Sequence, residues 1–229
     1  MKHNPIGRSA LAITLLATAS AKAIDVPVAD DAMVISSSAA NNQGAHINLN
    51  VSGLASSLRY SYLKFNVAAF VPAGTRPDDI EKAVIRLYPS VVTTAGTIAI
   101  HNVTSVWVEG KKNNTTASAG ELSWNLRPTE DATPEATVPI ALVDADEFLS
   151  LDVTILLKEW LTVAPATPAT PNFGIVLKPA AASPVNVAFD SKENITNTKQ
   201  PTLDVTLVKK RTLPRGDLGM GAFTTGPTP

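Results

Sequence analysis

Apolar and polar side chains alternate along residues 59–67, and this alternation predicts a β-strand with two different faces. One face carries apolar side chains only: Leu63, Phe65 and Val67. The other face carries aromatic and polar side chains: Tyr60, Tyr62, Lys64 and Asn66. The first face is typical of a buried core. The second is unusual for a solvated surface, because it combines two aromatic rings with a cation.

The same period of two marks several further segments as strands. These segments are residues 31–35, 46–51, 80–88, 97–103, 173–178, 185–190 and 202–208. Residues 80–88 begin with good helix formers, so a helix is the alternative there. The β-branched residues of this segment and the proline at position 89 favour a strand. The strand that begins at residue 59 is expected to end near Phe70.

The period changes in residues 151–161, where apolar side chains recur at the spacing of one helix face. They are Val153, Leu156, Leu157, Trp160 and Leu161. Residues 110–139 form a long polar connection, which favours a functional or mobile loop. About nine strands and one short helix predict an all-β fold, a β-sandwich with a jelly-roll-like arrangement.

The first residues have the composition of a secretory signal peptide. A basic start precedes a short apolar run over residues 9–21, and Ala21-Lys22-Ala23 has the small-x-small pattern of a cleavage site. The apolar run is too short to span a bilayer, which argues against the alternative of a retained anchor. We therefore expect a signal peptide over residues 1–23 and a secreted, extracellular protein.

The rest of the chain, about 206 residues, is long enough for one large sandwich domain. We expect this domain over residues 24–210 and a flexible tail over residues 211–229. Loss of Lys2, Arg8 and Lys22 with the signal leaves 16 basic against 20 acidic residues, a net charge near −4. Such a charge disfavours broad electrostatic attraction to nucleic acid, so nucleic acid is not an expected partner.

The inventory of reactive side chains excludes several kinds of site. The sequence contains no cysteine, which removes thiol chemistry and cysteine-based zinc sites. After signal cleavage only His46 and His101 remain, too few for a multi-histidine metal site. No nucleophile signature accompanies these histidines. We therefore expect a protein that is not an enzyme.

Several motifs occur in a fixed order along the chain. They are Asp31-x-x-Val34, Asn42-x-Gly44, Arg59-x-x-Tyr62-Leu-Lys-Phe-Asn66, Pro72-x-Gly74, Ala83-x-Ile85-x-Leu87-Tyr88, Val103-x-x-x-Trp107-x-Glu109, Asp152-Val-Thr154 with Trp160, Asn172-Phe-Gly174-Ile-Val-Leu177, Phe189-x-Ser191-x-Glu193 and Gln200-Pro201-x-Leu203. In this order and spacing the chain resembles the DNRLRE domain, also classed as carbohydrate-binding module family 96. The resemblance covers about residues 30–208. It implies an extracellular β-sandwich, and some members bind acidic polysaccharides such as alginate.

The strands over residues 59–67 and 80–88 offer a candidate binding surface if they lie in one sheet. Their outward faces would then form an aromatic and basic platform: Tyr60, Tyr62, Lys64, Lys82, Arg86 and Tyr88. Sugar rings stack on aromatic planes, and lysine and arginine pair with the carboxylates of uronic acids. The alternative is an ordinary sheet face, on which these side chains only cover their neighbours.

Three tryptophans are further candidates for sugar contacts. Trp107 and Trp160 each end an apolar run and are expected in the core, whereas the position of Trp124 stays open. Glu193 is expected to be a structural carboxylate that accepts backbone hydrogen bonds. The acidic run Asp144-x-Asp146-Glu147 offers oxygen ligands for calcium, but it lacks the spacing of an EF-hand and favours a solvated turn. We therefore expect no cofactor.

These observations predict a secreted, non-catalytic carbohydrate-binding domain whose partner is a polysaccharide, anionic if the platform is the site. The alternative is an extracellular structural or adhesive protein of the cell surface or matrix, which uses the same sandwich for assembly. A small lyase or hydrolase is the third possibility, and the residues give it little support.

Overall fold

The computed structural model describes residues 23–162, 171–196 and 198–208. The expected signal peptide, apart from Ala23, lies outside the described residues. The expected tail over residues 211–229 lies outside them as well.

The described residues form a mainly β structure, which confirms the predicted fold class. Its strands are β1 (Ala23–Ile35), β2 (Asn41–Asn42), β3 (Asn48–Ser52), β4 (Arg59–Phe65), β5 (Ile80–Leu87), β6 (Pro89–Thr94), β7 (Gly96–Asn102), β8 (Thr115–Thr116), β9 (Ala136–Ile140), β10 (Leu149–Asp152), β11 (Ile175–Pro179), β12 (Asn186–Asp190) and β13 (Thr202–Leu207). The helices are α1 (Val67–Phe70) and α2 (Thr154–Trp160), with the 3-10 turns η1 (Ser36–Ser38), η2 (Pro77–Asp79) and η3 (Leu142–Asp144). The helix predicted within residues 151–161 is therefore present.

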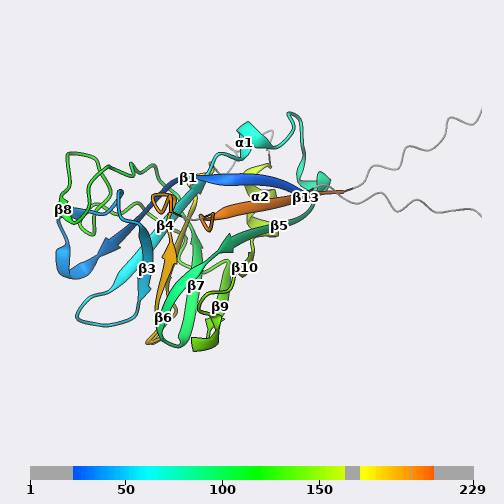
Figure 1. The fold of residues 1–229 in the computed structure, drawn as a ribbon. Coiled ribbons are helices and arrows are strands. Elements are labelled where there is room, and N and C mark those ends of the chain that lie inside the picture. Colours follow the sequence, from blue (N-terminus) through cyan, green and yellow to red (C-terminus); the bar gives the residue numbers. More distant parts are fainter. Residues whose placement is uncertain (1–22, 163–170, 197, 209–229) are drawn as a thin grey trace, which may run out of the picture.

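The long strand β1 joins the two parts of the β structure (Figure 1). Its first residues, Ala23 to Pro27, pair with β13, and its later residues, from Val28 to Ile35, pair with β4. A register shift between Val28 and Asp30 separates the two stretches. The strand order is β10-β5-β13-β1-β4-β11-β7-β9, with β3, β12 and β6 continuing from β4. All these pairings are antiparallel.

One large hydrophobic core lies between these strands. Leu63 and Phe65 of β4 are fully buried in it, as the alternation in this strand predicts. Helix α2 adds Leu156, Leu157 and Trp160, and the indole Nε1 of Trp160 donates a hydrogen bond to Asn102 at 3.1 Å. The burial of Trp160 was predicted from the sequence.

A second hydrophobic cluster lies on the opposite face of β4. It joins Tyr62 to residues of β1, to Val176 of β11, and to Trp107 and Leu122. Trp107 and Leu122 belong to residues 103–135, which we call the cover segment. Trp107 is buried, as predicted, and its indole donates a hydrogen bond to the Phe173 carbonyl at 2.8 Å. Part of the connection expected to be a functional or mobile loop, residues 110–139, thus belongs to the cover over a second sheet face.

Several strand boundaries differ from the sequence prediction, most of all at β1, which begins at Ala23 rather than at residue 31. Strand β4 ends at Phe65, and the chain turns into α1, where the Val71 amide donates to the Val67 carbonyl at 2.9 Å. Strand β5 ends at Leu87, as expected before Pro89. Pro89 itself begins β6, since proline is tolerated at the first position of a strand. The sequence prediction also omitted the short strand β10, which pairs with β5.

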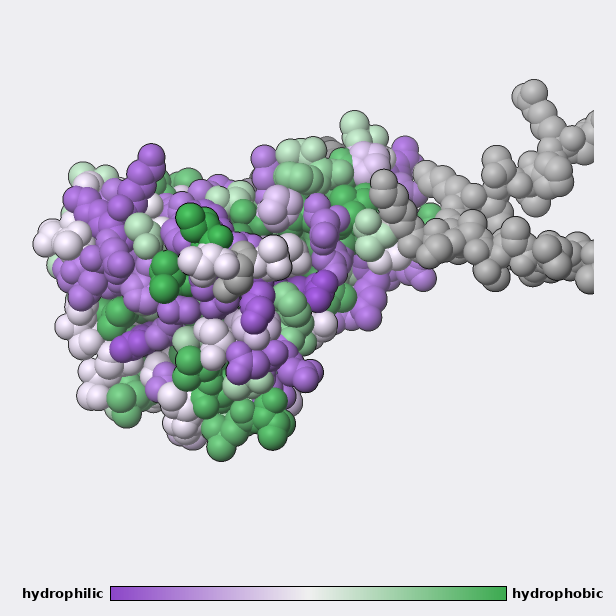
Figure 2. All heavy atoms as spheres, viewed as in Figure 1, coloured by the Kyte–Doolittle hydropathy of each residue, from purple (hydrophilic) through white to green (hydrophobic). Residues whose placement is uncertain are grey.

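The surface seen in Figure 2 is largely mixed, with hydrophilic and hydrophobic residues interspersed. At the bottom of this view apolar residues gather over β6 and η3, where Val91, Leu142 and Val143 are exposed. No helix among the described residues is both long and apolar enough to cross a membrane.

The pairing of β1 with β13 places two carboxyl groups side by side and makes stability depend on pH. Asp25 lies directly opposite Asp204. Burial raises the pKa of Asp204 to about 6, and the neighbouring Asp25 carboxyl adds to the rise. An aspartate of the unfolded chain titrates near about 4, so the folded state holds this proton more tightly. The stabilisation is therefore complete below about pH 4 and is lost as the pH rises through about 6.

Asp204→Asn removes this dependence. Between about pH 4 and pH 7 the midpoint of thermal unfolding should fall less in this variant than in the original protein. Asp152→Asn is a control of opposite sign, because hydrogen bonds from Thr154 lower the pKa of Asp152. The contribution of Asp152 to the stability of the folded protein is lost as the pH falls. Identical pH profiles for Asp204→Asn and the original protein would contradict this assignment.

Candidate functional site

The structure separates the two halves of the predicted platform. Strands β4 and β5 are not neighbours, because β1 and β13 lie between them. The platform was predicted on the condition that the two strands lie in one sheet and combine their outward faces. In the strand order, β13 and β1 lie between β5 and β4. Tyr62 and Tyr88 were expected on an outward surface, and this is wrong: their exposed fractions are 0% and 6%. Tyr62 lies under the cover segment.

The other predicted residues occupy three different surroundings. Lys64 faces Asp30 at 3.6 Å and lines a cavity that Trp160 also borders. Arg86 stacks on Phe148, with its Cζ 4.3 Å from the ring centroid. Lys82 is exposed near the start of β5. Of the six, Tyr60 and Tyr62 line a common cavity in the described part of the chain.

That cavity, which we call the aromatic groove, has a volume of about 450 Å³. Its lining residues come from β4, from β11 and from the cover segment: Tyr60, Tyr62, Trp124, Arg127, Pro128, Thr129, Glu130 and Lys178. The ladder between β4 and β11 pairs Ser61 with Leu177, so Lys178 follows directly beside Tyr60. The wall formed by the cover segment is fixed by backbone contacts, among them the amide of Thr104 donating to the carbonyl of Thr129 at 2.8 Å.

Two aromatic rings line part of the groove. The ring centroids of Tyr60 and Trp124 lie 4.9 Å apart, with the planes tilted by 46°. Both side chains are partly exposed. Aromatic rings held in this way offer planar apolar surfaces to the C–H face of a sugar ring.

Two cations flank these rings. The guanidinium Cζ of Arg127 lies 3.9 Å from the Trp124 ring centroid, and Lys178 Nζ lies 5.3 Å from the Tyr60 ring centroid. Such contacts with aromatic rings hold the side chains in place. Lys178 also forms an ion pair with Glu130. The groove therefore carries two positive charges and one negative charge.

The Tyr62 hydroxyl lies at the groove and has no hydrogen-bond partner among the described residues. Burial raises the pKa of this hydroxyl above its usual range, so it is a neutral donor and acceptor. A buried polar group without a partner costs free energy unless a bound molecule satisfies it. The hydroxyl thus offers a hydrogen bond to whatever enters the groove.

The comparison with protein families gives one match. The family model of carbohydrate-binding module family 96 matches residues 22–206. The chain belongs to carbohydrate-binding module family 96. No curated protein matches it. The family prediction is thereby confirmed, while the DNRLRE name stays a prediction from the motifs. The matched range contains the aromatic groove of this family 96 module in full.

The groove residues outside the predicted platform carry weak signals in the sequence. Whether Trp124 is buried or exposed was left open. Its position three residues before Arg127, on a polar segment, was the available indication of a surface site. Nothing in the local pattern singled out Lys178, whose place beside Tyr60 depends on the pairing of β4 with β11.

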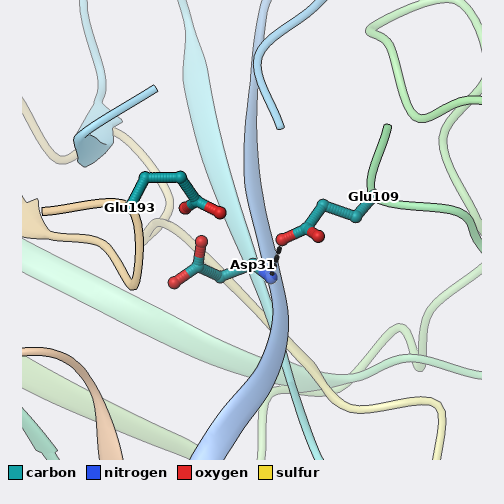
Figure 3. A group of neighbouring side chains, drawn as sticks. All are labelled: Asp31, Glu109 and Glu193. Carbon is teal, nitrogen blue, oxygen red and sulfur yellow. Dashed lines mark hydrogen bonds between the residues drawn. The ribbon is translucent and has the colours of Figure 1, made fainter. Parts of the chain in front are cut away.

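The module contains a second group of polar side chains, which come from β1, the cover segment and the residues that follow β12. Figure 3 shows Asp31 of β1 with Glu109 of the cover segment and Glu193, which follows β12. One carboxylate oxygen from each of the three lies within 4.8 Å of the others. Lys192 contacts two of them, at 2.6 Å from Glu109 Oε1 and in a closer ion pair with Glu193. We call these three acidic residues the carboxylate cluster.

Burial dominates the electrostatics of the carboxylate cluster. It raises the pKa of Asp31 to about 9, and the adjacent Glu193 carboxyl adds to the rise. Burial also raises the pKa of Glu109, against the opposing effect of Lys192. For Lys192 burial disfavours the charged form, but the hydrogen bonds to Glu109 and Glu193 outweigh it and raise the pKa. Glu193 was predicted to be a structural carboxylate, and it accepts a hydrogen bond from the Ser191 hydroxyl at 3.1 Å.

The two histidines that remain after the expected cleavage each contact a different backbone carbonyl group. His101 Nδ1 contacts the Asp131 carbonyl at 2.8 Å, and His46 Nδ1 contacts the Asn48 carbonyl at 3.0 Å. Both contacts are with backbone groups and fix the rings structurally.

Removal of the Tyr62 hydroxyl tests whether this group lacks a hydrogen-bond partner. Tyr62→Phe keeps the buried ring and deletes only the unpaired hydroxyl, so the free energy of unfolding should stay equal or rise by up to about 1 kcal/mol. Urea unfolding measures the change. Tyr88→Phe is the matched control, because the Tyr88 hydroxyl donates to Asp146 at 3.0 Å and its loss should cost about 1 kcal/mol. Equal losses in both variants would show that Tyr62 has a partner.

Proposed function

We propose that this family 96 module is a secreted, non-catalytic domain that binds an acidic polysaccharide in the aromatic groove. The single observation that carries the proposal is the convergence of Tyr60, Trp124, Arg127 and Lys178 on one cavity of about 450 Å³. Membership of a carbohydrate-binding family supports the sugar, and the two cations support its negative charge.

The groove offers three complementary contacts to a uronic acid residue. The rings of Tyr60 and Trp124 supply apolar planes for the sugar ring. Arg127 supplies paired donors for a carboxylate, and Lys178 supplies a point charge. The Tyr62 hydroxyl supplies a hydrogen bond at the base of the groove. The stacking and the charges together favour an anionic over a neutral glycan.

The arrangement of Arg127 on Trp124 also restricts the guanidinium before ligand arrives. A side chain that is already ordered loses less conformational entropy on binding. The ion pair between Lys178 and Glu130 provides a way to select charge, because a ligand carboxylate can replace Glu130 as the partner of Lys178. A neutral sugar has no carboxylate that could replace Glu130 as the partner of Lys178.

Binding of alginate oligosaccharides to the purified protein, measured by calorimetry, tests the proposal. Arg127→Ala should weaken binding about tenfold or more, since a charge-assisted hydrogen bond contributes about 1.5–3 kcal/mol. Trp124→Ala should also weaken binding, because it removes an aromatic plane on which the sugar ring stacks. A neutral oligosaccharide of equal length should bind more weakly than alginate, and added salt should reduce the difference.

The matched control is Arg86→Ala, which removes an arginine stacked on an aromatic ring outside the groove. Affinity for alginate should be unchanged in this variant. Loss of binding in Arg86→Ala together with full binding in Arg127→Ala would move the site to the predicted platform residues Lys82, Arg86 and Tyr88. Assembly into filaments without any glycan binding would instead favour the structural or adhesive alternative.

A further inference from the structure

The carboxylate cluster is not used by the proposed glycan site, and its composition is unusual for a protein interior. Three acidic side chains meet from parts of the chain as distant as Asp31 and Glu193. Asp31 is 1% exposed, and the side chains of Glu109 and Glu193 are 17% and 21% exposed. Lys192 supplies one positive charge to three acidic groups. Burial of unbalanced charge is costly, so the cluster needs either a proton on one of its carboxyl groups or a further cation.

Each carboxylate of the cluster is held by a donor that leaves oxygen atoms facing the others. The Lys192 amide donates to Asp31 Oδ2 at 2.9 Å, and the Asp31 amide donates to Glu109 Oε1 at 2.7 Å (Figure 3). The Ser191 hydroxyl donates to Glu193 Oε2 at 3.1 Å. These bonds fix the orientation of the acidic groups independently of Lys192 Nζ.

The remaining oxygen of Asp31, Oδ1, is buried and has no hydrogen-bond partner among the described residues. Figure 3 shows one oxygen of this carboxylate turned toward the carboxylate of Glu193. Neither group brings a donor when ionised, so a close approach requires a proton or a metal cation between them.

We propose that Asp31, Glu109 and Glu193 bind a calcium ion. Calcium takes oxygen ligands at roughly 2.3–2.6 Å, so ligands on opposite sides of the ion lie roughly 4.8 Å apart. The three carboxylate oxygens fall within this limit. Magnesium requires near-ideal octahedral geometry at about 2.0–2.1 Å and keeps several of its waters, so a site of three carboxylates from the protein suits it less well.

Lys192 and the calcium ion are alternative partners for the same oxygens. The ammonium contacts Glu109 and Glu193, so it must move when the ion binds. Its side chain is 24% exposed, which leaves it a route to solvent. The backbone amide of Lys192 keeps its bond to Asp31 in either state. The lysine thus balances the cluster at low calcium and lowers the affinity for the ion.

The consequence of calcium binding is mechanical support for the cover segment. Glu109 lies two residues after Trp107, whose ring centroid is 5.8 Å from that of Tyr62. An ion shared by Asp31 and Glu109 ties the cover segment to β1 in addition to the hydrophobic cluster. The ion therefore stabilises the folded state, and the proposal does not depend on glycan binding.

Calcium titration of the full chain, first stripped with a chelator, tests the site by calorimetry and thermal unfolding. At about a hundred times the dissociation constant, calcium chloride should raise the unfolding midpoint by roughly 5–10 °C. Magnesium chloride at the same concentration should give a smaller rise. Asp31→Asn should weaken calcium binding at least about tenfold, because it removes a charged ligand.

The variant Lys192→Ala distinguishes a calcium site from a network that contains salt bridges alone. Without calcium this variant should unfold at a lower temperature, and calcium should bind to it several-fold more tightly than to the original protein. A salt-bridge network predicts the loss of stability without recovery by calcium. Glu193→Gln is the second ligand variant in case Asp31→Asn does not fold, and it should also weaken calcium binding.

Asp204→Asn is the matched control, because Asp204 and Asp25 form a close carboxyl pair elsewhere in the module. Calcium should bind to this variant as it does to the original protein. Absence of both heat and a midpoint shift on calcium addition would overturn the proposal and leave a shared proton between Asp31 and Glu193. Unchanged calcium affinity in Asp31→Asn and Glu193→Gln would overturn it as well.

Discussion

The burial of Tyr62 between the sheet and the cover segment determines most of what the surface of this module can do. Tyr62 packs against Trp107 and Leu122 and lies beside Val176 of β11, so the polar-looking face of β4 is the floor of a second core. Because the cover segment is fixed there, its later residues form one wall of the aromatic groove. Its earlier residues bring Glu109 to β1. Both candidate sites are products of the same packing interaction.

Much of the fold was accessible from the sequence because alternation and helical spacing are local properties. Leu63 and Phe65 were assigned to the core, and the helix within residues 151–161 was recognised from its apolar stripe. Alternation does not tell whether the second face of a strand meets water or another part of the chain. Tyr62 was therefore placed outside, although Trp107 and Leu122 of the cover segment bury it.

The candidate sites were less accessible, since they depend on contacts between distant residues. Strands β4 and β5 follow one another in the chain, yet β1 and β13 separate them in space. Tyr60 was nominated, whereas Lys178 beside it could be found only from the strand pairing. Asp31, Glu109 and Glu193 each stood in a family motif. Their convergence had no local spacing to reveal it, because 78 positions separate the first two.

The pairing of β1 with β13 has a consequence for how the module bears force. Ala23 lies opposite Thr206, so the chain enters and leaves the described domain at the same end of an antiparallel ladder (Figure 1). Hydrogen bonds of such a ladder run across the strands. Tension applied through the two chain ends would load these bonds one after another, as in a zipper, rather than all together in shear. A module anchored through both ends would therefore open first at β1 and β13, far along the chain from the residues of the groove.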